Sequence, residues 1–166
     1  MIKVLKNPKT KDYLGFKNWV TGPDFTWNYN VKTTNSTVDL PFYTHAFIKR
    51  PETEGYPKID NPQETEGVVK MLMEILKYND VVMNSFVRLS VNATPPQNSI
   101  MTSIPHVDHQ FKHGNLIIYF TDAGGSTFVE GEEHCPEEDD IVLFTGEHYM
   151  ETPAENRRVN LVATMI

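Results

Sequence analysis

The sequence has one cysteine, few basic residues and no long apolar run, and each shortage excludes a class of protein. With Cys135 alone, no internal disulfide can form, so we expect a reducing compartment such as the cytoplasm. No stretch approaches the roughly 18 apolar residues that a membrane helix needs, and the N-terminal segment has no apolar signal-peptide region. We therefore expect no membrane partner.

Because basic residues are fewer than acidic ones, the chain has a negative net charge. The 15 Lys and Arg residues stand against 22 Asp and Glu residues, which gives a formal net charge of −7. A chain this acidic has no general electrostatic attraction for nucleic acid, so nucleic-acid binding is not expected. A hydrophobic fraction of 39% is typical of a globular protein, and no repeat or long linker divides the chain. Residues 1–166 therefore predict a single domain.

The first half predicts strands and one supporting helix. Segments 25–31 and 40–48 are typical of strands, joined by a polar, Thr/Asn-rich turn, and the rest of the first third is expected to be irregular. A helix is predicted from Pro62 to Tyr78, because Asn61 is a favourable N-cap and apolar residues recur at helical spacing. Residues 1–80 should thus supply N-terminal strands and a helix.

The second half has the sequence pattern of an all-β protein. Short β-branched and aromatic runs, separated by turn signals, predict strands at 81–91, 115–121, 126–129, 141–145 and 158–166. Several short strands without helices between them favour a sandwich or barrel. The predicted class is mainly β (α+β), with residues 81–166 as a β-sandwich core.

A candidate metal site begins with His106 and Asp108. Two residues apart on an extended segment, their side chains project to the same side while Val107 points away. His148 is the natural third ligand, because it follows an apolar strand and a short glycine turn. Two imidazoles and one carboxylate form the facial triad of non-haem Fe(II) oxygenases. The alternative is that both histidines are ordinary surface or core residues.

The last strand carries a candidate anion-binding residue. Arg158, Asn160 and Val162 share one of its faces. A guanidinium that points into a sandwich is costly unless an anion meets it, and a cosubstrate carboxylate would do so. The alternative is that Arg157 and Arg158 both reach solvent, which their adjacency permits for only one of them.

From about Phe86 to the C-terminus, the sequence resembles the Fe(II)/2-oxoglutarate-dependent dioxygenases, especially the prolyl-4-hydroxylase-like branch and its small phage-encoded relatives. The matching segments, in chain order, are 86–92, the HxD motif at 105–108, 116–128 with its paired glycines, 140–148 and 158–161. The resemblance implies a double-stranded β-helix, the cupin-like jelly roll of that family. The predicted helix would then support the outside of one sheet, in a protein of the host cytoplasm.

The resemblance also implies roles for particular residues. His106, Asp108 and His148 would bind Fe(II), and Arg158 would pair with the distal carboxylate of 2-oxoglutarate. Tyr119 would donate a hydrogen bond nearby. Two further residues complete this set: Asn160 is a weaker candidate for a pocket contact, and Arg157 is the alternative to Arg158.

The implied reaction uses dioxygen and 2-oxoglutarate to hydroxylate a substrate, either a peptidyl residue such as proline or a small molecule. The sequence departs from the family in two ways. Asp122 stands where many relatives carry Asn, and the chain is too short for several of the substrate-covering loops of larger relatives. Two other functions stay open: a Zn-dependent hydrolase using the same ligands, and an inactive cupin-like metal-binding module.

Other polar features have simpler interpretations. His109 and His113 flank the metal motif and are expected on a solvated loop, with substrate contact as the alternative. Arg88 is expected either to line the substrate end of the pocket or to pair with an acid. The acidic segment 130–140 is expected to be a solvated face, with steering of a basic partner as the alternative. His134 and Cys135 beside these acids offer a second metal site as a further alternative.

Overall fold

The structure is a computed structural model and describes residues 1–31 and 40–166. The predicted Thr/Asn-rich turn lies outside the described residues. The elements, in chain order, are β1 (Lys3–Leu5), α1 (Lys11–Thr21), β2 (Asn28–Asn30), β3 (Phe42–Lys49), α2 (Pro51–Glu54), β4 (Lys58–Ile59), α3 (Pro62–Tyr78), β5 (Phe86–Thr94), β6 (Gly114–Tyr119), β7 (Thr127–Val129), β8 (Glu132–His134), β9 (Ile141–Phe144), β10 (His148–Met150) and β11 (Arg158–Met165).

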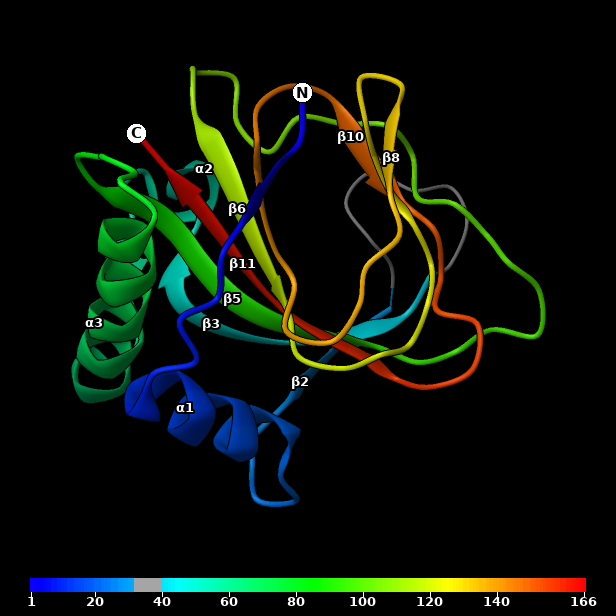
Figure 1. Ribbon diagram of the computed structural model, residues 1–166, viewed down its shortest axis with the longest axis horizontal. Helices are drawn as coiled ribbons and strands as arrows, with labels where there is room; N and C mark the ends of the chain where they lie inside the picture. The colour runs from blue at the N-terminus through cyan, green and yellow to red at the C-terminus, as the bar shows by residue number, and fades with distance from the viewer. Residues whose placement is uncertain (32–39) are drawn as a thin grey trace.

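Two antiparallel sheets face one another. In the described part of the chain, the major sheet has the order β1-β9-β6-β11-β5-β3-β2, with β4 beside β3, and the minor sheet has the order β10-β7-β8. Figure 1 shows the minor sheet on one side of the major sheet and helices α1 and α3 on the other. The segment before β6 joins the minor sheet through two isolated bridges, Thr102 with Glu151 and His106 with His148.

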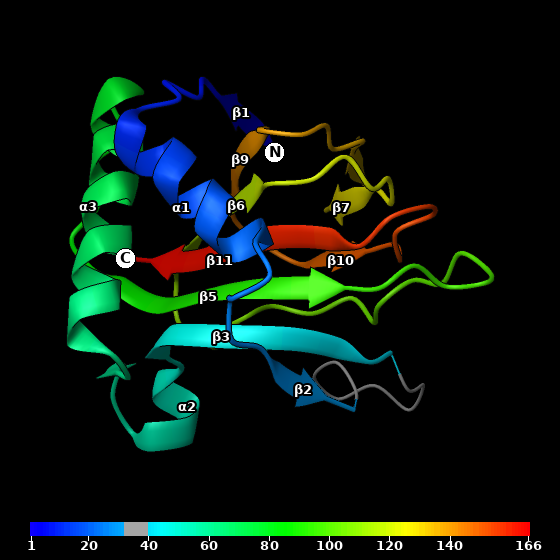
Figure 2. The ribbon, with the colours of Figure 1, turned by 90° about the horizontal axis from the view of Figure 1, so that it is seen from below.

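Side-chain alternation gives the major sheet an apolar face and a polar face. On β11, Val159, Leu161 and Ala163 belong to the main core, which also contains buried side chains of α1 and α3. The alternate residues of β11 turn toward the minor sheet, as predicted for Arg158 and Asn160. In Figure 2, β11, β5 and β3 run side by side and α3 lies across one end of them. The space between the sheets is therefore the place for a polar site.

The helix predictions had two outcomes. Helix α3 has the predicted bounds, and the Asn61 side chain accepts a hydrogen bond from the Glu64 N–H at its first turn. The expectation of irregular structure over the first third is wrong, because α1 is a helix of 11 residues capped by Thr10. Only Tyr13, Phe16 and Val20 are buried along it, so its sequence pattern is weak.

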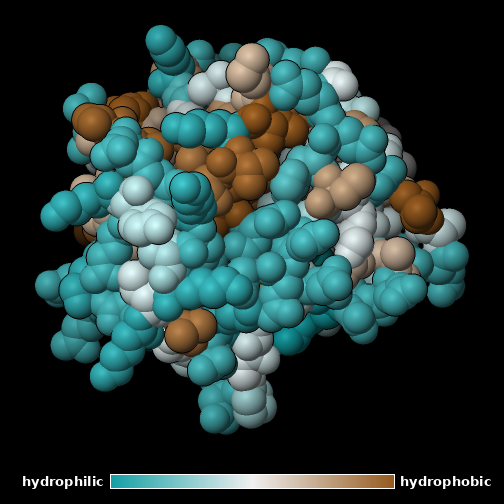
Figure 3. Space-filling model, in the orientation of Figure 1, coloured by the Kyte–Doolittle hydropathy of each residue, from teal (hydrophilic) through white to brown (hydrophobic). Residues whose placement is uncertain are grey.

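Each predicted strand has a counterpart in the structure, with shifted bounds, but β1, β4, β8 and β10 were not predicted. The strand expected at 81–91 begins at Phe86 and runs to Thr94, and the one expected at 25–31 shrinks to three residues. Residues of the first half, in β1 and β3, pair directly with strands of the second half. Among the described residues, no helix is long and apolar enough to cross a membrane. The face drawn in Figure 3 is mostly hydrophilic, with apolar side chains gathered near β1.

Candidate metal centre

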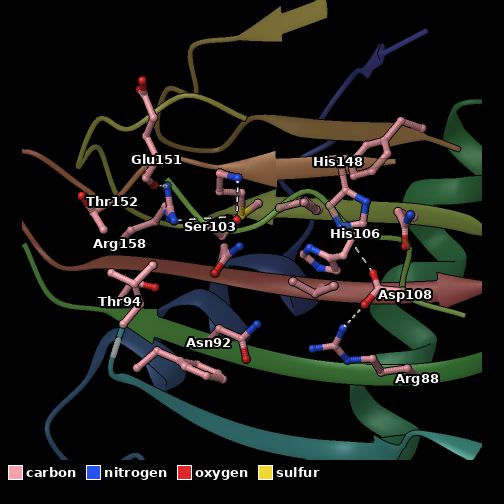
Figure 4. A pocket seen from close by; sticks show the side chains of 18 of the residues that line it. Arg88, Asn92, Thr94, Ser103, His106, Asp108, His148, Glu151, Thr152 and Arg158 are labelled. Carbon is pink, nitrogen blue, oxygen red and sulfur yellow. Dashed lines mark hydrogen bonds and ion pairs between the residues drawn. The ribbon is translucent and has the colours of Figure 1, made fainter. Parts of the chain in front are cut away.

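The structure brings His106, Asp108 and His148 together. The two histidines exchange backbone hydrogen bonds of 3.0 and 2.9 Å, and their ring centroids lie 4.6 Å apart. Asp108 Oδ2 lies 3.6 Å from His148 Nε2. One possible ligand atom from each of the three residues lies within 4.8 Å of the other two. Figure 4 shows the three side chains converging at one end of the pocket.

Backbone carbonyls orient both imidazoles. His106 Nδ1 is 2.8 Å from the Ile104 carbonyl oxygen, and His148 Nδ1 is 3.3 Å from that of Gly146. Because a carbonyl only accepts, each Nδ1 carries the proton and leaves Nε2 free as a ligand. Burial lowers the pKa of His148, against the opposing effect of Asp108, and so favours the neutral imidazole that binds metals.

Two arginines hold the third ligand. Asp108 Oδ1 accepts hydrogen bonds from Arg88 at 2.8 Å and from Arg50 at 2.5 Å. Burial would raise the pKa of Asp108, but the charges of Arg88 and Arg50 outweigh it and keep that pKa well below its usual range. Arg88 therefore pairs with an acid, which is one of its two predicted alternatives, and its side chain also lines the pocket. Arg50 was missed, because nothing in the N-terminal sequence connects it to the distant HxD motif.

Arg158 lies at the other end of the same pocket (Figure 4). Arg158 is 4% exposed, and its guanidinium donates to the carbonyls of Gly125 and Glu151, at 3.2 and 2.9 Å, and contacts Met150 Sδ at 3.9 Å. Its Nε is buried without a partner among the described residues, and burial lowers its pKa. Arg157 instead is exposed, with its guanidinium 6.0 Å from the Trp27 ring centroid. Of the two predicted alternatives, Arg158 is the one that faces the pocket.

Polar side chains line the pocket between these two ends. Asn92 and Asn160 are register partners on β5 and β11, and both side chains line the cavity. Asn115 also lines it, with both amide atoms buried and without a hydrogen-bond partner among the described residues. The predicted contact residue Tyr119 is not among the residues that line the pocket, and its hydroxyl lies 2.6 Å from the Thr127 hydroxyl. Sequence reasoning missed Asn115 because a single polar residue at a strand start is an unspecific signal.

The expectation that His109 and His113 occupy a solvated loop is wrong. Their exposed fractions are 3% and 9%. His109 Nδ1 lies 2.7 Å from Glu52 Oε1, and its Nε2 lies 2.7 Å from the Thr164 hydroxyl. The imidazole also stacks on Phe111 with ring centroids 4.8 Å apart. Polar partners and an aromatic neighbour thus make the burial of His109 favourable.

The acidic segment 130–140 is largely exposed, as expected, but part of it has a structural role. Asp139 accepts a hydrogen bond of 2.6 Å from the Tyr13 hydroxyl and forms an ion pair with Lys17. His134 lies 3.2 Å from Asp140. Across residues 1–31 and 40–166, the cluster formed by the HxD residues and His148 is the only group of three possible metal ligands.

No protein-family model and no curated protein sequence matches this chain. Solved structures do match its fold. A 2OG-Fe(II) oxygenase family oxidoreductase from Burkholderia pseudomallei has 13% identity and a TM-score of 0.64, over 83% of this chain and 72% of that chain. A prolyl hydroxylase from Trichoplax adhaerens, in complex with a hypoxia inducible factor peptide fragment, has 11% identity and a TM-score of 0.64, over 99% and 83%.

A third similar structure is that of an enzyme with a different reaction, an epimerase. It is the non-haem alpha ketoglutarate dependent epimerase SnoN of nogalamycin biosynthesis, with 10% identity and a TM-score of 0.61 over 99% of this chain and 77% of that chain. At such identities the likeness concerns the fold. The prediction of a mainly β jelly roll with a supporting helix is confirmed, although the sheets do not close into a barrel. The chain has the fold of 2OG-Fe(II) oxygenases of known structure.

Proposed function

We propose that the protein is an Fe(II)- and 2-oxoglutarate-dependent oxygenase. His106, Asp108 and His148 would hold Fe(II), and Arg158 would bind the distal carboxylate of 2-oxoglutarate. The observation that carries the proposal is one pocket with a three-ligand cluster at one end and, at the other, a buried guanidinium that has no carboxylate partner within residues 1–31 and 40–166. When bound, the metal and its keto-acid cosubstrate would supply the oxidation of a substrate C–H group by dioxygen.

The residues present suit these two groups. Two imidazoles and one carboxylate form the donor set of the facial triad. The Nε of Arg158 and the amide of Asn115 are buried polar groups without a hydrogen-bond partner in the described part of the chain, and a polar ligand would satisfy them. A planar guanidinium is well suited to bind a carboxylate through two hydrogen bonds.

The chain's own side chains would orient the cosubstrate and exclude water. Ile117, Phe144 and Val162 form an apolar part of the pocket wall and lie within one hydrophobic cluster. A wall of this kind strengthens the attraction between Arg158 and a bound carboxylate, because it lowers the local dielectric constant. We assign Asn160 as a further cosubstrate contact, because it lies two residues from Arg158 on the same face of β11.

The substrate that we propose is a peptide side chain such as proline. Support comes from the fold shared with a prolyl hydroxylase that was solved with a peptide fragment. The formal charge of −7 favours a neutral or basic peptide over nucleic acid.

The test is an anaerobic titration of the Fe(II)-loaded protein with 2-oxoglutarate, followed by the visible charge-transfer absorption of an iron–keto acid chelate. We expect a saturable band that disappears in the His148→Ala variant. Iron binding without such a band would refute the oxygenase and leave a hydrolase or an inactive metal-binding module. A matched Arg157→Ala variant should keep the band, because Arg157 lies outside the pocket.

A further inference from the structure

Asp108 is held by two guanidiniums from different parts of the chain. Arg88 comes from β5 and Arg50 from the turn between β3 and α2, and both donate to the same oxygen, Oδ1. The Asp108 side chain is 3% exposed, so these hydrogen bonds lie away from bulk water. Figure 4 shows Arg88 reaching from β5 toward Asp108 on the side away from the histidines. The other oxygen, Oδ2, is the one that lies 3.6 Å from His148 Nε2.

The backbone next to Asp108 is held by the same parts of the chain. Arg50 also donates to the Asp108 carbonyl oxygen at 3.0 Å, and Glu52 of α2 contacts His109 Nδ1 at 2.7 Å. Thr164, the register partner of Arg88 on β11, contacts the other nitrogen of His109. Since residues 107–112 belong to no strand, side chains rather than a sheet ladder fix the position of this loop.

We propose that Arg50 and Arg88 are positioning residues for the metal centre. By occupying Oδ1, they fix the Asp108 carboxylate so that Oδ2 alone is presented to the metal. The proposal rests on the role of Asp108 as a metal ligand in the proposed function. It makes the turn before α2 part of the metal centre, although this turn precedes the HxD motif by more than 50 residues.

Positioning and simple electrostatics predict opposite effects for the same substitution. A cation beside a metal ligand repels the metal, so its removal would strengthen metal binding if charge alone mattered. Loss of a partner that orients a ligand instead weakens metal binding, typically by 10- to 100-fold. The sign of the change in metal affinity therefore separates the two explanations.

The experiment measures Co(II) affinity of the metal-free protein by competition with a chromophoric chelator. We expect Arg50→Gln and Arg88→Gln each to weaken Co(II) binding by about tenfold or more. Both should change the visible ligand-field spectrum of bound Co(II), which a purely structural role would leave intact. Arg157→Gln is the matched control, because it removes the same charge from an exposed site and should bind Co(II) like the wild type.

A double-mutant comparison ties the effect to the carboxylate. In an Asp108→Ala background, Arg88→Gln should cause no further loss of Co(II) affinity, because the oxygen that Arg88 orients is gone. If Arg88→Gln does not fold, the Co(II) affinity of Arg50→Gln tests the proposal. The Arg50 side chain is 24% exposed, so its replacement disturbs the core less.

Three results would overturn the inference: unchanged or tighter Co(II) binding in both folded arginine variants, an unchanged Co(II) spectrum, or a full additional loss in the Asp108→Ala background. Absence of Co(II) binding by the wild type would instead refute the metal site itself. A wild type that binds Co(II) but gives no band with 2-oxoglutarate would refute the proposed oxygenase and leave the positioning role intact.

Discussion

Replacement of Arg158 by methionine should separate cosubstrate binding from folding. Methionine keeps the length and much of the apolar contact of the side chain while removing its charge. Arg158 is 4% exposed, and its guanidinium donates to two backbone carbonyls but to no carboxylate among the described residues. It is therefore a buried cation whose electrostatic partner is the proposed ligand.

The expected loss of 2-oxoglutarate affinity is large. Removing one member of a buried, hydrogen-bonded charge pair costs about 2–5 kcal/mol. At about 1.4 kcal/mol for each factor of ten, this corresponds to a dissociation constant raised roughly 30-fold to a few thousandfold. Anaerobic titration of the Fe(II)-loaded Arg158→Met variant, followed by the charge-transfer band, measures this value directly.

The free energy of unfolding without cosubstrate should change far less. The variant loses two hydrogen bonds to carbonyls, of about 1 kcal/mol each. It also no longer buries a charge that has no counter-ion, which is costly in a low-dielectric interior and offsets part of that loss. Urea unfolding of the cosubstrate-free protein should thus differ little from wild type, while added 2-oxoglutarate should stabilise only the wild type.

Two results would refute this reasoning. Wild-type affinity for 2-oxoglutarate in Arg158→Met would remove Arg158 as the anchor, most directly if Arg157→Met lost affinity instead. A destabilisation by several kcal/mol in the absence of cosubstrate would show that Arg158 is needed for folding rather than for binding.

Three further outcomes test other parts of the structure. Burial would raise the pKa of Asp139, but hydrogen bonds from its lysine neighbours lower that pKa to about 2. The ionised Asp139 therefore stabilises the fold above the ordinary pKa of 3.8, and this stabilisation is lost as pH falls toward 2. Asp139→Asn should flatten the fall in melting temperature over that pH range. Gly125→Ala should lower the free energy of unfolding by about 1–3 kcal/mol in urea, because φ is +81° and a Cβ would lie 2.6 Å from the Thr152 carbonyl oxygen. Tyr119→Phe should lower the free energy of unfolding by about 1–3 kcal/mol, because it leaves the buried Thr127 hydroxyl without its partner. A loss of 2-oxoglutarate affinity in this variant, measured by the anaerobic titration, would support the cosubstrate contact that the family resemblance implies.

Local signals made part of this fold predictable. The bounds of α3 follow from an N-cap and an apolar stripe, both of which act within a few residues. The two faces of β11 follow from the alternation of a strand, which places Arg158 and Asn160 on one face, whereas the structure shows that this face lines the pocket.

Elements that depend on tertiary contacts were not predictable in the same way. Strands β8 and β10 have three residues each, and they exist because β7 lies between them as a common partner. Helix α1 buries only three side chains, against the same core as α3 and the major sheet. Neither case leaves a periodic pattern long enough to identify from the sequence.

The metal centre shows why a ligand motif can be found while its supports cannot. His106 and Asp108 are two residues apart, so their spacing alone identifies them as a candidate pair of ligands. Arg50 reaches the same site only because β3 pairs with β5, which places the turn before α2 beside the loop that holds Asp108. The burial of His109 has the same origin, since its partners belong to α2 and β11. A polar loop is exposed unless the fold supplies partners for it, and those partners are a property of the topology rather than of the loop.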